Sequence, residues 1–181
     1  MTIIELLVSI TIGLIVLTAA GLMWIFLLRS FVAAGNYADL DAKSRMAVDT
    51  MLSEIRESSL VTGFQNNGSN NWLSLTNVLE ANSGIKYLWS ADSRMLTRQK
   101  SGEPDRTYLT ECDSWDFQLY QRSPHPSGIY IFYPATNAFG TNDATIAKLI
   151  NMSWRCSRAI MGQKRNTENV QTAQVVLRNK S

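Results

Sequence analysis

The sequence predicts an α+β fold, in which a long N-terminal α-helix packs on a C-terminal head built around a mostly antiparallel β-sheet. Three observations predict this fold. No proline interrupts residues 1–62, apolar residues in that segment follow helical spacing, and short β-rich runs replace the pattern after Trp72. The predicted parts are an apolar helix half at 1–28, an amphipathic helix half at 29–62, a linker at 63–71 and a globular head at 72–181.

The first helix half is almost free of charge. Residues 1–28 contain a single ionisable side chain, Glu5, and residues 6–28 form a run of 23 residues without any. As a helix this run is about 35 Å long, enough to cross a hydrocarbon core of about 30 Å. A secretory signal peptide fits poorly, because it needs a basic segment before a shorter apolar core. A plain membrane anchor remains an alternative.

Glu5 is the residue that a plain anchor does not explain. A carboxylate at the edge of an apolar helix is costly and is usually functional, with a partner of opposite charge. The α-amino group of a chain start, its own or that of a packed neighbour, is the partner we expect.

The second helix half is amphipathic. Val48, Leu52 and Ile55 follow the spacing i, i+4, i+7, and Met51 lies beside them. Charged residues of both signs cover the remaining surface, including Asp39, Lys43 and Glu54. We expect a solvated face there, with salt bridges between subunits as the alternative. The following linker at 63–71 has glycines around an asparagine-rich run, which predicts a connection rather than an element.

The head contains only short strand-like runs. We predict strands near residues 72–77, 85–90, 94–99, 107–112, 115–122, 129–133, 147–158 and 170–178. Residues 91–93 form the expected hairpin turn between two of them. No helical pattern separates the runs, so the sheet should be mostly antiparallel.

Composition excludes several classes of function. Hydrophobic residues make up 45% and charged residues 18% of the 181 residues, which is typical of a folded chain. The net charge of +2 does not favour nucleic acid as a default partner. Two cysteines and one histidine, His125 in a proline-flanked loop, leave no recognisable catalytic or metal-binding constellation. We therefore expect no enzyme activity, no metal and no cofactor.

Residues 1–10, MTIIELLVSI, resemble the mature N-terminus of type IV pilins and type II secretion pseudopilins. That family begins with an apolar residue, carries Glu at the fifth position and continues as a long apolar helix. The resemblance implies that Met1 is the residue that a prepilin peptidase exposes and N-methylates. It also implies that Glu5 pairs with the N-terminal amine of a neighbour during assembly. No basic leader precedes Met1, so we expect this sequence to be the mature form. Leu22 is a departure, because many major pilins have proline there.

The order of elements in the head resembles the W-type minor pilins and the J-type minor pseudopilins. This resemblance implies a structural subunit of an extracytoplasmic filament, held in the inner membrane as a single-pass protein before it assembles outside the cytoplasm. The implied partners are copies of itself or related pilins, a prepilin peptidase and an assembly platform. The alternative is a minor, tip-located subunit that acts as an initiation or binding module in type II secretion, adhesion or DNA uptake.

Cys112 and Cys156 both lie on predicted strands, in the part that would sit outside the cytoplasm. Disulfides persist in such compartments, and a bridge between the two would close a loop of about 45 residues. Two buried free thiols fit the same pattern. The spacing is not that of a redox-active Cys-x-x-Cys pair.

Overall fold

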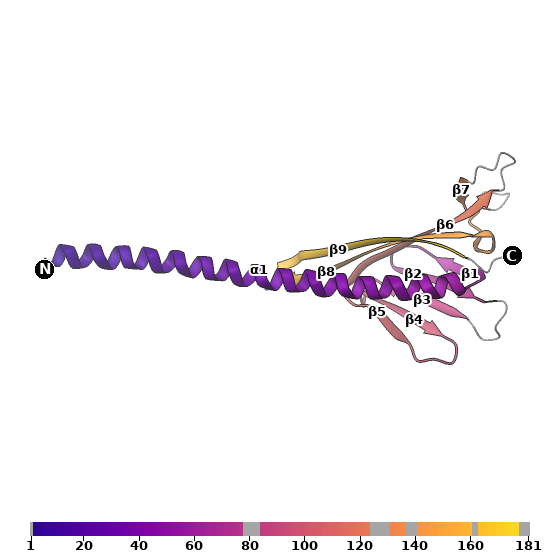
Figure 1. The fold of residues 1–181 in the computed structure, drawn as a ribbon, viewed down its shortest axis with the longest axis horizontal. Helices are drawn as coiled ribbons and strands as arrows, with labels where there is room; N and C mark the ends of the chain where they lie inside the picture. The colour runs from indigo at the N-terminus through magenta and orange to yellow at the C-terminus, as the bar shows by residue number, and fades with distance from the viewer. Residues whose placement is uncertain (1, 78–83, 124–130, 137–140, 161–162, 178–181) are drawn as a thin grey trace.

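The computed structural model describes residues 2–77, 84–123, 131–136, 141–160 and 163–177. Within these ranges one long helix lies along two antiparallel sheets, which confirms the predicted α+β class (Figure 1). Met1 and His125 lie outside the described residues.

Helix α1 runs without interruption over Ile3–Glu57, a length of 55 residues and about 80 Å. The absence of proline explains its continuity. It ends at Ser58, whose backbone is extended and whose N–H donates to the carbonyls of Glu54 and Ile55. The predicted extension to residue 62 is therefore wrong, because the chain from Leu60 onward pairs as a strand.

The first sheet has five strands in the order β1-β2-β3-β4-β5, each antiparallel to its neighbours. The strands are β1 (Leu60–Gln65), β2 (Asn70–Thr76), β3 (Ile85–Ser90), β4 (Met95–Lys100) and β5 (Arg106–Leu109). The expected turn between β3 and β4 is present at residues 91–94.

The prediction that residues 63–71 form a linker is wrong, because these residues belong to the β1–β2 hairpin. Only residues 66–69 form the turn. The side chain of Asn71 accepts hydrogen bonds from the backbone N–H groups of Asn67 and Gly68. Gly68 has φ +79°, a conformation that favours glycine. The asparagine-rich run is thus a hairpin turn held by its own side chains.

The second sheet has four strands in the order β7-β6-β8-β9, again antiparallel. They are β6 (Cys112–Ser123), β7 (Ile131–Pro134), β8 (Leu149–Ile160) and β9 (Gln163–Val176), with the short helix η1 (Ala144–Ile146) before β8. The strand predicted at 107–112 is split, because β5 ends at Leu109 and Cys112 begins β6. Between them Glu111 has φ 60°, and the chain changes sheet there.

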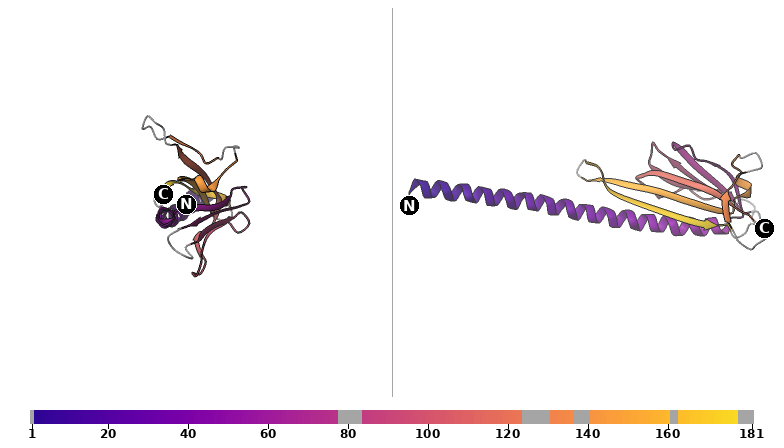
Figure 2. Two further views of the ribbon diagram at one scale, coloured as in Figure 1. Left: turned by 90° about the vertical axis from the view of Figure 1, so that its right-hand side faces the viewer. Right: turned by 90° about the horizontal axis from the view of Figure 1, so that it is seen from above.

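The core lies between the sheets and the C-terminal part of α1. The helix buries one stripe, formed by Leu40, Ser44, Ala47, Met51 and Ile55. Val48 and Leu52 of the predicted stripe pack against this core but stay partly exposed. No residue between 2 and 39 is buried, so the first part of the helix extends away from the head as a free rod (Figures 1 and 2).

Candidate functional site

The N-terminal half of α1 exposes apolar side chains around its whole circumference. Residues 6–28 carry no ionisable side chain, and none of them is buried. Ile3 is 81%, Leu22 69% and Phe26 69% exposed. Water disfavours such a surface by about 25 cal/mol per Å², so a partner or a lipid phase is needed to cover it.

The polar groups within this apolar half are satisfied inside the helix. The hydroxyls of Ser9 and Thr11 donate to the carbonyls of Glu5 and Val8, each at 2.8 Å. The hydroxyl of Thr18 lies 2.9 Å from the Leu14 carbonyl. Because these hydroxyls need no water, they can enter lipid or a packed bundle of helices. In the described part of the chain this is the one helix long and apolar enough to cross a membrane.

Glu5 closes a capping box with Thr2. The backbone N–H of Thr2 donates to Glu5 Oε2 at 2.8 Å, and the backbone N–H of Glu5 donates to Thr2 Oγ1 at 3.4 Å. The carboxylate also lies in the first turn, where the helix dipole favours negative charge. The sequence signal for this contact is the Thr-x-x-Glu spacing before an apolar run, which was not predicted above as a capping box. A carboxylate keeps lone pairs for further donors, so the box leaves room for a second partner.

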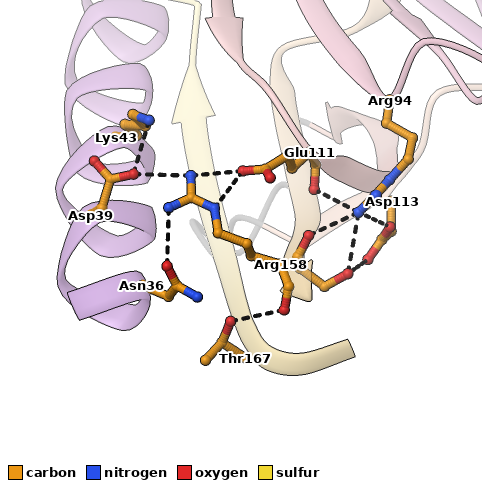
Figure 3. A network of polar contacts seen from close by, with 9 residues as sticks. Asn36, Asp39, Lys43, Arg94, Glu111, Asp113, Arg158 and Thr167 are labelled. Carbon is orange, nitrogen blue, oxygen red and sulfur yellow. Dashed lines mark hydrogen bonds and ion pairs between the residues drawn. The ribbon is translucent and has the colours of Figure 1, made fainter. Parts of the chain in front are cut away.

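A network around Arg158 of β8 holds the middle of the helix against the second sheet (Figure 3). Its Nη2 lies 3.0 Å from Asp39 and 2.7 Å from Glu111, and its Nη1 donates to Asn36 at 3.3 Å. Lys43 also pairs with Asp39, at 2.9 Å. The hydrogen bonds from Lys43 and Arg158 hold the pKa of the Asp39 carboxyl below its usual value.

A second cluster, around Glu54, holds the end of the helix against the first sheet. Glu54 Oε1 pairs with Arg98 at 2.7 Å, and Oε2 accepts from the hydroxyls of Tyr87 and Tyr108 at 2.6 and 3.1 Å. Burial, and then the nearby charge of Glu54, raise the pKa of Tyr108 to about 12. The expectation of a solvated face is therefore wrong for Glu54.

The two clusters fix the head on the same helix that carries the apolar half. Arg158 of β8 and Arg98 of β4 bind α1 at two separate levels and from two different sheets. The position of the head relative to the exposed apolar half is thereby set by a continuous helix and by its polar contacts with both sheets, rather than by a loop.

The structure brings only some of the predicted site residues together. Glu5 meets Thr2, while Cys112 and Cys156 lie opposite each other on β6 and β8. The roles of Glu54 and Arg158 were missed, since their partners are distant in sequence. In the described ranges no group of three or more His, Cys, Asp and Glu side chains could hold a metal ion.

No family model, curated protein or solved structure matches this chain. The functional proposal therefore rests on its own residues and on the resemblance of residues 1–10 to pilins.

Proposed function

We propose that this chain is a structural subunit of an extracytoplasmic, type IV pilus-like filament. Its apolar half is stored in the inner membrane and is then buried among the helices of other copies or of related pilins. The observation that carries the proposal is the single helix Ile3–Glu57, apolar and unburied in its first half and fixed to the head in its second. A filament needs this rigid link, because regular packing of the helices must place every head in the same way.

The apolar surface alone gives little driving force for moving the helix from the membrane into a filament. Lipid tails are as apolar as leucine, so moving the helix from lipid to a bundle gains mainly close packing and polar contacts. Any polar group that can pair only in the assembled state therefore has a large influence on register.

Glu5 is that group in the apolar half, because it is the only ionisable side chain in residues 1–28. In the assembled state its carboxylate pairs with the N-terminal amine of a neighbouring subunit. A buried charge left without its partner costs about 3–5 kcal/mol, which makes misregistered packing unfavourable. In the free subunit the capping box with Thr2 holds the carboxylate in the first turn.

Three variants separate the charge of Glu5 from its capping role. Glu5→Gln keeps an oxygen that can accept from Thr2 but removes the charge, since Gln also fits a capping box. Thr2→Ala removes the cap and keeps the charge, and Glu5→Ala removes both. Membrane insertion is measured by fractionation, filament incorporation by shearing and electron microscopy, and N-terminal processing by mass.

All three variants should insert into the membrane with the same N-terminus as the wild type. Glu5→Gln and Glu5→Ala should lower filament incorporation by more than about tenfold, because the pair is lost, while Thr2→Ala should keep most of it. Wild-type incorporation of Glu5→Gln, or an equal loss in Thr2→Ala, would contradict the pairing role.

A further inference from the structure

We infer that Cys112 and Cys156 form a cross-strand disulfide that joins β6 to β8 beneath the helix. The two residues are directly opposite each other in the antiparallel register of these strands. Both are buried, at 0% and 1% exposure. The inference concerns the head alone and does not require the filament.

The hydrogen bonds beside the pair define its geometry. The N–H of Ser157 donates to the carbonyl of Glu111 at 3.0 Å, so the residues flanking the cysteines make the ladder bond and the cysteines themselves do not. Directly opposed residues of this non-hydrogen-bonded kind have Cα atoms about 4.5 Å apart. Disulfides span Cα separations of about 4.4–6.8 Å, so the expected separation of the two cysteines lies within this range, near its lower limit.

Both thiols are free and buried in the structure, and the Cys112 thiol donates to the carbonyl of Ser114 at 3.3 Å. The adjacent Cys156 thiol, and then burial, raise the pKa of the Cys112 thiol, while the Cys112 thiol lowers the pKa of Cys156. Ser44, a buried residue of α1, lies beside Cys156. The helix therefore covers the pair once the head has folded.

A polar network fixes the backbone around the cysteines without help from the sulfur atoms (Figure 3). Asp113 is the extra residue of a bulge next to Cys112 and pairs with Arg94 at 2.6 Å. Arg94 also donates to the carbonyls of Ser157 at 2.8 Å and Glu111 at 3.2 Å. The hydroxyl of Ser157 donates to Asp113. Since both flanks are held in place, forming the bond requires little movement of either strand.

The reaction is an oxidation of two thiols by a disulfide, such as glutathione disulfide. Both S–H bonds break, one S–S bond forms, and the two electrons and two protons pass to the oxidant, which becomes two thiols. Because α1 covers the pair, the exchange takes place while the chain folds. Outside the cytoplasm such bonds persist, and the closed loop of residues 112–156 contains β7 and η1.

The test refolds the full chain in detergent with a buffer of reduced and oxidised glutathione. The product should be lighter than the reduced chain by two hydrogen atoms and should show no free thiol when denatured. Trypsin should release peptides 107–122 and 156–158 joined to each other. Reduction should lower the unfolding midpoint by about 10 °C, because the loop is then open in the unfolded chain.

The double variant Cys112→Ala with Cys156→Ala is the control, and its midpoint should not respond to the reductant. Cys112→Ala alone should leave one thiol that reacts only in denaturant. Two free thiols in the refolded wild type, or a bridge between two chains in place of the internal one, would overturn the inference.

Discussion

Glu54 on α1 and Arg98 on β4 form an ion pair of 2.7 Å in which Arg98 is only 4% exposed. The pair joins the last turn of the helix to an inner strand of the first sheet. Glu103, in the turn between β4 and β5, binds the same guanidinium at 2.6 Å, so the charge of Arg98 is balanced from the helix and from this turn. The head is therefore fixed to the helix by charge as well as by the apolar core.

Glu54→Ala should destabilise the head by about 3 kcal/mol, because Arg98 then stays buried with only one of its two carboxylate partners. Chemical unfolding of the full chain in detergent measures the change. Asp49→Ala, an exposed residue on the same helix, is the matched control and should change the stability by less than about 0.5 kcal/mol. Equal effects of the two variants would contradict the anchoring role of Glu54.

Acid should weaken the head partly through Glu103. Hydrogen bonds from Arg98, and then from Lys100, lower the pKa of its carboxyl to about 2, whereas an unperturbed Glu lies near about 4.3. A lowered folded-state pKa stabilises the fold above the unfolded-state value and loses that effect as pH falls toward about 2.

Stability curves between about pH 5 and pH 2 test this dependence. Glu103→Gln should be less stable than the wild type at neutral pH and should flatten the acid limb of the curve. Glu168→Gln, an exposed residue of β9, should leave the limb unchanged. If the acid part of the stability curve is the same in Glu103→Gln as in the wild type, the ion pair of Glu103 with Arg98 does not cause the acid sensitivity.

Deletion of residues 1–28 should give a soluble, folded head. None of residues 2–28, the part of the deletion that the structure describes, is buried, and the helix contacts of Asn36, Asp39 and Glu54 are kept. We expect a monomer in sedimentation and an unfolding midpoint within a few degrees of that of the full chain. Deletion of residues 1–45 is the contrasting variant, since it also removes Leu40 and Ser44 from the core and should unfold the head. Aggregation of the shorter deletion would contradict the division of the helix into a free half and a docked half.

Much of the fold could be predicted because local signals agreed with the final packing. The lack of proline predicted one continuous helix, and alternation located most strands, with Ile85–Ser90 matching the prediction at both ends. Strand β1 was missed because Gly63 and the asparagines that begin at position 66 signal a turn. Its strand conformation comes from pairing with β2, a contact that local sequence does not encode.

The candidate site was only partly predictable for the same reason. Glu5 stood out because it is the single charge of an apolar run, but its contact with Thr2 required recognition of the capping spacing. Glu54 looked like any surface acid, because Arg98 reaches it only through the fold. Cys112 and Cys156 were both placed on strands, and only the register of β6 against β8 sets them opposite each other.

The most direct test of the proposed function asks where the intact chain is found in the cell that makes it. Extracellular and periplasmic fibres are released by shearing, labelled with an antibody against the head, and examined by electron microscopy and mass spectrometry. We predict labelled fibres that contain the chain with its complete apolar helix. Recovery of the chain only as a single membrane-bound molecule, with no fibre that contains it, would contradict the proposed function.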